Sequence, residues 1–247
     1  MMLQRLSRFV LSLIRPKSYV GLLGSVLAVS VAYDVIGDLR VANVVTTVIG
    51  VFALIAACRV ISQNKKLLMA NLIIAGVGVI MFALALFLPV HPFDTWYFRE
   101  ASILCAMLFV VITVVMILKD IFSSPVNGNK ICGAICVFLL IAVTFEMCHT
   151  MVFFFDPNAY HLATKFDADP QSIQLDTRGV FMYFSFCTLT TLGYGDITPV
   201  SRIARTLCWM EAVIGQFYLA ILVARLVGLY LAAEMVKSRP SRVDEEL

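Results

Sequence analysis

The amino-acid sequence predicts an all-α membrane protein, and three observations lead to that fold class. Of the 247 residues, 61% are hydrophobic and 14% are charged, whereas a soluble globular chain carries about 25% charged residues. Long apolar runs recur along most of the chain, and about 20 apolar residues suffice to cross a bilayer. The net charge is only +3, so no nucleic-acid partner is expected.

The first predicted element is an amphipathic helix over residues 1–18. Arg5, Arg8 and Arg15 lie at helical spacing, opposite leucine, isoleucine and phenylalanine side chains. We expect this helix to lie in the membrane interface with its basic face toward the lipid head groups. A cleaved signal peptide is the alternative, but no small-residue cleavage site follows cleanly before Asp34.

Six apolar runs then satisfy the length criterion for transmembrane helices. They are residues 19–36, 41–61, 67–90, 101–118, 131–155 and 206–235. Between the fifth and the sixth lies a further apolar segment, residues 180–189, which is too short to span. We expect it to form a re-entrant helix, capped at its start by Asp176 or Thr177.

Basic residues set the orientation of these spans. Arginine and lysine side chains precede the first span, separate the second from the third and the fourth from the fifth, and follow the sixth. These connections share one side, so both termini are expected in the cytosol of a plasma membrane or bacterial inner membrane.

The strongest break in the chain divides it into two modules. Pro125 and the Asn127-Gly128 pair stand among polar residues, which is typical of a turn. We therefore expect a linker at residues 123–130 between a four-helix module at 19–122 and a second module at 131–236. Residues 237–247 are expected to form a short cytosolic tail.

The sequence "TTLGYGD", residues 190–196, interrupts the apolar pattern of the second module. Non-helical backbone in a bilayer is tolerated only where protein buries it or where it lines an aqueous path. Glycine reaches backbone angles closed to other residues, so Gly193 and Gly195 would let successive carbonyls face one side. A column of carbonyl oxygens can replace the water around a dehydrated monovalent cation.

This motif resembles the selectivity filter of potassium channels, and the likeness extends over the last third of the chain. The resemblance implies that Thr191, Leu192, Gly193, Tyr194 and Gly195 line the ion path. The backbone carbonyls of Thr191 to Tyr194, with the threonine hydroxyl, would coordinate K⁺. Asp196 and Thr190 would support the filter. Valine is commoner at the position of Leu192, which puts the rigidity of the filter in question more than the identity of the ion.

The resemblance continues into the last span. Gly215 falls where the family often has a hinge glycine. On a helix counted from it, Gln216, Leu219 and Val223 share a face that would line a cavity below the filter, and Val227 would form the narrowest inner point. Ordinary helix packing is the alternative for this face. A ring of carbonyls needs several chains, so a homotetramer is expected.

The aromatic residues and the ionisable residues near the filter carry further expectations. Four aromatic residues would form a wall behind the filter: Phe181, Tyr183, Phe184 and Phe186. Glu146 and His149 form a Glu-x-x-His pair on one helix, which either binds a metal or makes a contact between helices. Glu211 is expected to point behind the pore, toward the fifth span or the re-entrant helix.

The fourth span lacks the charges of a voltage sensor, because Arg99 and Lys119 stand at its ends and no basic residue lies between them. Steep voltage dependence needs several charges per subunit. The sequence thus predicts a K⁺ channel with little intrinsic voltage dependence. A non-selective cation channel and a non-conducting regulatory or scaffold subunit are the alternatives. No cofactor other than permeant K⁺ is expected, membrane lipids are the expected surroundings, and a gating ligand or regulatory partner is left open. No nucleophile-base pair or nucleotide loop suggests an enzyme.

Overall fold

The computed structural model describes residues 19–35, 65–87, 92–123, 128–162 and 170–237. The predicted amphipathic helix, the second predicted span and the short tail lie outside these ranges. The described helices are α2 (Tyr19–Val35), α4 (Lys65–Phe87), α5 (Pro92–Ser123), α6 (Gly128–Phe155), α7 (Pro170–Leu189) and α8 (Arg202–Lys237). A 3-10 turn, η1 (Pro157–Ala159), and two short strands, β1 (Tyr160–Leu162) and β2 (Ile197–Pro199), complete the set.

The fold is mostly helical, and three of the described helices are long and apolar enough to cross a membrane. These segments are Glu100–Ser123, Gly128–Phe155 and Arg202–Gly228. Tyr19–Val31, Leu68–Phe82 and Gly179–Leu189 are shorter apolar helices. The described residues therefore establish an integral membrane protein, and they agree with the sequence on where its fourth, fifth and sixth apolar runs lie.

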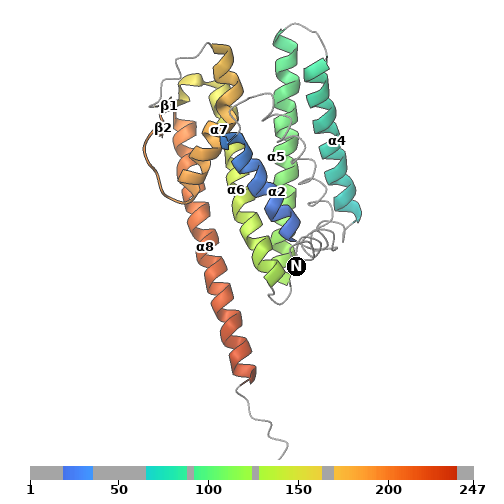
Figure 1. The fold of residues 1–247 in the computed structure, drawn as a ribbon, viewed down its shortest axis with the longest axis vertical. Helices are drawn as coiled ribbons and strands as arrows, with labels where there is room; N and C mark the ends of the chain where they lie inside the picture. Colours follow the sequence, from blue (N-terminus) through green and yellow to red (C-terminus); the bar gives the residue numbers. More distant parts are fainter. Residues whose placement is uncertain (1–18, 36–64, 88–91, 124–127, 163–169, 238–247) are drawn as a thin grey trace, which may run out of the picture.

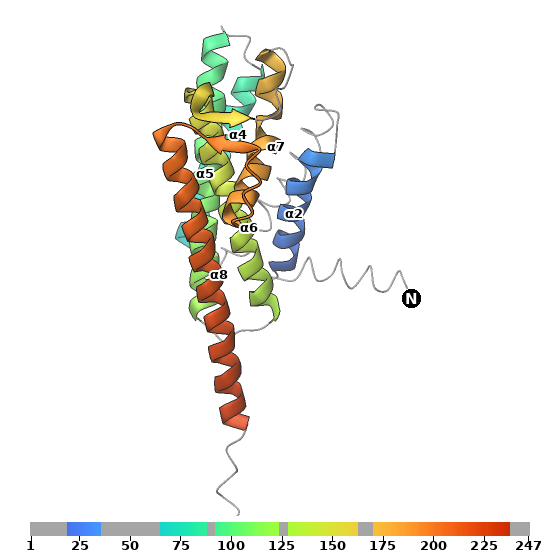
Figure 2. The ribbon, with the colours of Figure 1, turned by 90° about the vertical axis from the view of Figure 1, so that its left-hand side faces the viewer.

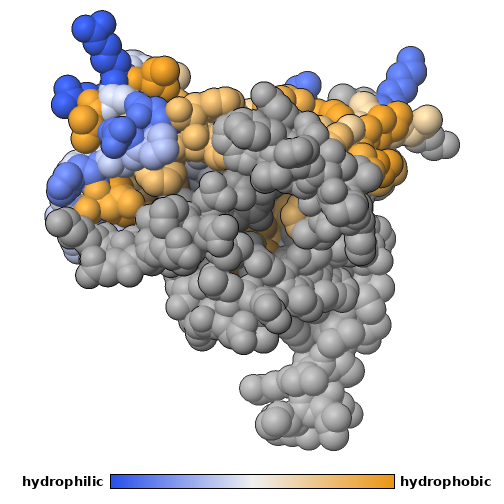
Figure 3. All heavy atoms as spheres, turned by 90° about the horizontal axis from the view of Figure 1, so that it is seen from above, coloured by the Kyte–Doolittle hydropathy of each residue, from blue (hydrophilic) through white to orange (hydrophobic). Residues whose placement is uncertain are grey.

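Helix α6 stands at the centre of the arrangement. Helices α2, α5, α7 and α8 all pack against it, while α4 packs on the outer side of α5. Figure 1 shows α8 running down one edge of the molecule and extending beyond the other helices, and Figure 2 shows it from the side. Seen from above, hydrophilic side chains gather on the side where β1, β2 and α8 lie, and apolar surface runs toward α4 and α5 (Figure 3).

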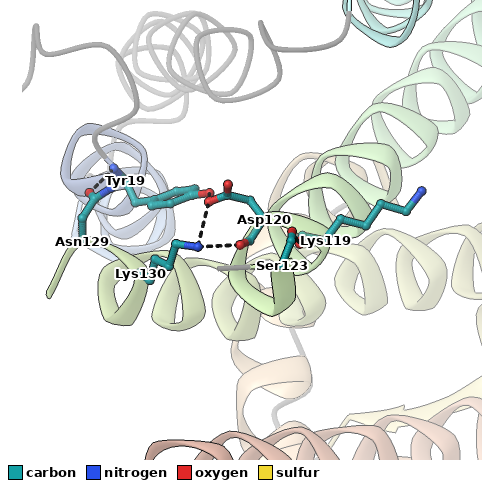
Figure 4. A network of polar contacts seen from close by, with 6 residues as sticks. All are labelled: Tyr19, Lys119, Asp120, Ser123, Asn129 and Lys130. Carbon is teal, nitrogen blue, oxygen red and sulfur yellow. Dashed lines mark hydrogen bonds and ion pairs between the residues drawn. The ribbon is translucent and has the colours of Figure 1, made fainter. Parts of the chain in front are cut away.

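Helix α2 is anchored to α5 and α6 at one end by a polar cluster (Figure 4). The Tyr19 hydroxyl donates to Asp120 Oδ2 at 2.6 Å, and the Tyr19 backbone N–H donates to Asn129 Oδ1 at 2.8 Å. Lys130 Nζ donates to the Asp120 carbonyl oxygen at 2.6 Å and lies 3.9 Å from its carboxylate. The ring of Tyr19 packs directly against Gly133. A Cβ added at that glycine would lie only 3.0 Å from the ring.

Helix α7 differs from its prediction at the start. It begins at Pro170, so the expected caps Asp176 and Thr177 lie inside the helix. Proline is favoured in the first helical turn because its missing N–H has no partner there. The polar residues that follow it concealed the first half of the helix from a search for apolar runs.

Helix α8 begins after a short sheet. Strands β1 and β2 pair antiparallel, with Tyr160 opposite Pro199, His161 opposite Thr198 and Leu162 opposite Ile197. Ser201 then caps α8, since its Oγ accepts a hydrogen bond from the Ala204 N–H at 3.2 Å. The sheet therefore joins the chain before α7 to the chain after residues 191–195, and it holds both ends of the re-entrant segment together.

Candidate functional site

The predicted filter, residues 191–195, follows α7 and has an alternating backbone. Thr191, Gly193 and Gly195 have φ angles of +59°, +55° and +82°, while Leu192 and Tyr194 do not have positive φ. Positive φ is rare for a β-branched residue such as threonine and costs free energy. Such strain persists where the surrounding structure holds it, and it clusters at functional sites.

The end of α7 holds this backbone through its own carbonyl groups. The Cys187 carbonyl oxygen accepts from the Leu192 N–H at 2.8 Å and from the Gly193 N–H at 3.3 Å, and the Thr188 carbonyl oxygen accepts from the Thr191 N–H at 3.0 Å. The segment thus satisfies these N–H groups on the α7 side.

Asp196 lies beside the filter and is held by a tyrosine that the sequence did not single out as its partner. The Tyr183 hydroxyl donates to Asp196 Oδ2 at 2.8 Å, and the Ile197 N–H donates to Asp196 Oδ1 at 3.1 Å. The rings of Tyr183 and Tyr194 stack with centroids 6.4 Å apart and planes at 4°. Tyr183 therefore touches the filter at two points. The signal for it was an aromatic residue with a hydroxyl on the last turns of α7.

The expected aromatic wall divides into two sets. Phe181 and Phe184 pack edge-on with Tyr160 of β1, in a cluster that also contains Ala159 and Ala204. Tyr183 alone of the expected four is stacked on a filter residue among the described ring contacts. The ring contacts therefore join Tyr183 to the filter and join Phe181 and Phe184 to Tyr160, and the wall of four aromatic residues stays a prediction.

Gln216 of α8 lies next to the lower end of the filter. Its Nε2 donates to Thr191 Oγ1 at 3.4 Å, and Thr191 Oγ1 itself donates to the Thr190 carbonyl oxygen at 2.6 Å. Thr190 Oγ1 donates to the Phe186 carbonyl oxygen at 2.7 Å, which ties it to α7. Leu219, Val223 and Val227 are exposed on the same helix in the single chain. Their expected roles in a cavity and a constriction stay predictions.

Gly215 is buried against the end of α7. A Cβ at this position would lie 2.4 Å from the Leu189 carbonyl oxygen, which is far inside van der Waals contact. Helix α8 runs unbroken through Gly215. Close approach of two helices therefore accounts for a glycine here without any bend, and the hinge stays a prediction.

A buried polar cluster links the helices behind the filter. His149 of α6 and Glu211 of α8 are 0% exposed, and His149 Nε2 lies 3.0 Å from Glu211 Oε2. Glu211 Oε1 also bonds the Ser185 hydroxyl of α7. Glu211 thus points toward both predicted neighbours. Glu146 accepts from Thr150 Oγ1 at 3.1 Å.

The described residues contain no group of three histidine, cysteine, aspartate or glutamate side chains that could hold a metal ion. The filter region contains a run of backbone carbonyls with a threonine hydroxyl at one end, oxygen atoms of the kind that alkali cations accept.

Comparison with known proteins identifies the region that contains this site. Residues 133–231 match a family model described as an ion channel. The matched residues run from α6 through α7 and the filter into α8. Neither the curated proteins nor the solved structures compared with the chain gave a match. Residues 133–231 are thus an ion channel pore domain, and that family is one of channels rather than enzymes.

Proposed function

We propose that this protein is a K⁺-selective channel that conducts passively through a central homotetrameric pore. The alternating backbone of residues 191–195 carries the proposal. Positive φ at Thr191, Gly193 and Gly195, between residues of ordinary φ, is a geometry that turns successive carbonyls to one side. Carbonyls of Thr191, Leu192, Gly193 and Tyr194 would then form consecutive rings around K⁺ in the assembled pore.

The exposure of the filter in a single chain supports assembly. Leu192 is 55% exposed and Tyr194 is 68% exposed, beside a backbone that belongs to neither a helix nor a strand. Irregular backbone cannot face lipid. Further copies of the chain, placed around an aqueous axis, would cover these groups, and four copies fit the carbonyl-ring design.

The contacts behind the filter favour K⁺ selectivity over a non-selective cation pore. Tyr183 bonds Asp196 and stacks on Tyr194, so two residues of the filter region are tied to α7. A filter braced in this way resists collapse onto a smaller ion. Leu192 presents its side chain in place of the commoner valine, and the bracing by Tyr183 does not depend on that side chain.

In the proposed pore, Gln216, Leu219 and Val223 line the cavity and Val227 forms the constriction. The Gln216 bond to Thr191 supports this placement, since it sets one face of α8 directly below the filter. We place the channel in a plasma membrane or bacterial inner membrane with both termini in the cytosol, as the basic connections indicate.

A flux assay tests the proposal. Purified protein in liposomes should pass K⁺ down a gradient and pass little Na⁺ under the same conditions. Gly193→Ala should abolish K⁺ flux: nothing lies within 4 Å of the added Cβ, but the φ of +55° strains it. Gly76→Ala is the matched control, since its Cβ also has open space and its φ is ordinary.

Three outcomes distinguish the candidates. Equal K⁺ and Na⁺ flux would establish the non-selective channel. An assembled tetramer that passes neither ion would establish the scaffold or regulatory subunit. Wild-type K⁺ flux in Gly193→Ala would show that conduction does not depend on the positive φ of Gly193.

A further inference from the structure

Four buried side chains from four different elements form one continuous chain of hydrogen bonds behind the filter. The Tyr160 hydroxyl of β1 lies 2.7 Å from His149 Nδ1 of α6, and His149 Nε2 lies 3.0 Å from Glu211 Oε2 of α8. Glu211 Oε1 bonds Ser185 Oγ of α7. Ser185 Oγ in turn donates to the Ala142 carbonyl oxygen of α6 at 2.7 Å.

Counting donors and acceptors assigns the protons in this chain. A tyrosine hydroxyl, a neutral imidazole, a protonated carboxyl group and a serine hydroxyl each donate one hydrogen. Tyr160 then donates to His149 Nδ1, and His149 Nε2–H donates to Glu211 Oε2. Ser185 has a single hydrogen for two acceptors, Glu211 Oε1 and the Ala142 carbonyl oxygen; a protonated Glu211 would donate its own hydrogen to Ser185 Oγ and leave that of Ser185 for Ala142. Every hydrogen has one acceptor, and no atom carries a net charge.

The ionised alternative satisfies the same atoms less well. An imidazolium uses both ring nitrogens as donors, so the Tyr160 hydroxyl would lose its acceptor at His149. A Glu211 carboxylate would compete with the Ala142 carbonyl for the single hydrogen of Ser185. His149, Ser185 and Glu211 are all 0% exposed, and two charges taken out of water there carry a large desolvation cost.

We propose that Glu211 is protonated and uncharged, and that it is the positioning residue that locks α7 and the attached filter between α6 and α8. This inference rests on the proposed channel function for its consequence, but the protonation of Glu211 stands apart from conduction. These four hydrogen-bonded side chains do not contact the ion or the filter backbone, so their effect on permeation passes through α7.

Helix geometry connects the hydrogen bonds of Glu211 to the filter. Leu189 follows Ser185 by four residues on α7, and Gly215 follows Glu211 by four residues on α8. Residues four apart on a helix lie on the same face, one turn along. The Glu211–Ser185 bond and the Gly215–Leu189 contact are therefore adjacent turns of one seam between α7 and α8. The Cys187 carbonyl oxygen accepts from the Leu192 and Gly193 N–H groups of the filter. Cys187 lies between Ser185 and Leu189 along α7.

Loss of the Glu211 proton would weaken the hydrogen bonds that hold α7 between α6 and α8. A carboxylate only accepts, so Ser185 would turn its hydrogen to Glu211 and release the Ala142 carbonyl oxygen of α6. Among the described residues, the titratable groups around Glu211 are Tyr160 from β1, His149 and Cys148 from α6, and Cys208 from α8; α7 contributes Ser185. Burial raises the pKa of the Tyr160 hydroxyl above its ordinary value, so Tyr160 keeps its hydrogen while Glu211 titrates. Alkaline pH should thus weaken the hold on α7.

Infrared spectroscopy of the purified full-length protein tests the protonation directly. The wild type at neutral pH should show the carbonyl band of a protonated carboxyl group, and this band should disappear in Glu211→Gln. Glu146→Gln is the matched control, because Glu146 is a second buried glutamate whose bond goes to Thr150. It should leave the Glu211 band in place. A wild-type spectrum without any band lost on Glu211→Gln would overturn the proposal.

Liposome K⁺ flux tests the positioning role. A glutamine at 211 keeps one acceptor for His149 and one donor for Ser185, so Glu211→Gln should match the wild type at neutral pH and stay constant as the pH rises. Wild-type flux should fall on the same rise. Glu211→Ala leaves two buried groups without a partner and should reduce flux about tenfold at every pH. If the alanine variant does not fold, the comparison of wild type with glutamine decides alone.

The two measurements separate this inference from the proposed function. A Glu211 band in a protein that passes no K⁺ would remove the channel function and leave the protonation standing. K⁺ flux in a protein without the band, with identical pH profiles for the wild type and Glu211→Gln, would remove the inference and leave the channel standing.

Discussion

Gly215 of α8 and Leu189 of α7 touch so closely that a single methyl group would not fit between them. A Cβ on Gly215 would lie 2.4 Å from the Leu189 carbonyl oxygen and 2.9 Å from its Cδ1. The carbonyl belongs to the backbone, so it cannot rotate away as a side chain would. Gly215→Ala should therefore force α8 from α7 and destabilise the protein by about 1–3 kcal/mol, the usual cost of overpacking. Thermal unfolding in detergent measures this.

Gly228 supplies the control on the same helix. Nothing lies within 4 Å of a Cβ there, and alanine is the better helix former by about 1 kcal/mol. Gly228→Ala should leave the unfolding temperature unchanged or raise it. If Gly215→Ala were as harmless as Gly228→Ala, the seam between α7 and α8 would not depend on close approach.

Hydropathy located the pore helices well, and the reason is physical. Side chains of α6 and α8 must be apolar where they face the hydrocarbon of a bilayer, so apolar runs mark most of each helix. The polar first half of α7 carries no such mark, and only Pro170 signalled its start. The strand pair of β1 and β2 also went unpredicted, because three-residue strands have too few positions for a pattern.

Partners within the site were harder to predict than positions. The sequence showed that Glu211 and His149 are ionisable residues inside apolar runs, and such residues are functional hypotheses by default. It left open whether Glu146 and His149 bind a metal or make a contact between helices, and it directed Glu211 toward the fifth span or the re-entrant helix. The fold brings Glu211 to His149 across a separation of 62 residues, a pairing that only the packing of α6 on α8 determines. The fold likewise brings Tyr183 of α7 to Asp196, on the other side of the filter segment in the sequence.

The Tyr183 hydroxyl should govern how long the filter stays conductive. Tyr183→Phe removes the bond to Asp196 and keeps the ring stacked on Tyr194. One net hydrogen bond is worth about 1 kcal/mol, so we expect a several-fold faster decay of K⁺ current with K⁺/Na⁺ selectivity retained. Single-channel recordings in planar bilayers measure both quantities.

A double-mutant cycle assigns that effect to the pair. Asp196→Asn weakens the same bond from the other side, so the combined variant Tyr183→Phe with Asp196→Asn should decay little faster than either single variant. Fully additive effects would mean that the two residues act through different contacts.

The polar cluster at the start of α2 should contribute to stability (Figure 4). Tyr19→Phe removes the donor to Asp120 and leaves the aromatic ring over Gly133. We expect a loss of about 0.5–1.5 kcal/mol, read as a lower unfolding temperature. Ser25→Ala is the control in the same helix, because the Ser25 hydroxyl bonds only the Leu22 carbonyl oxygen of its own turn among the described contacts. Equal shifts in the two variants would show that α2 is not held through Asp120.

The conductance of the proposed channel should depend only weakly on voltage. Helix α5 has basic residues at Arg99 and Lys119 and none between them, and one charge that crosses the field supplies about 2.3 kcal/mol per 100 mV. Without several such charges, the open probability should vary gradually over the physiological range. Recordings in planar bilayers without blocking ions measure the slope.

Arg225 is a basic residue inside the apolar part of α8, and its surroundings argue against a sensing role. Its guanidinium lies 4.5 Å from the centroid of the Phe122 ring at the end of α5, in a contact that links α8 to α5 and is favourable where it stands. A charge held in this way does not travel through the field. Arg225→Gln should therefore leave the voltage slope unchanged, even where the broken contact shifts the open probability. A steep slope in the wild type that flattens in Arg225→Gln would identify this arginine as a gating charge.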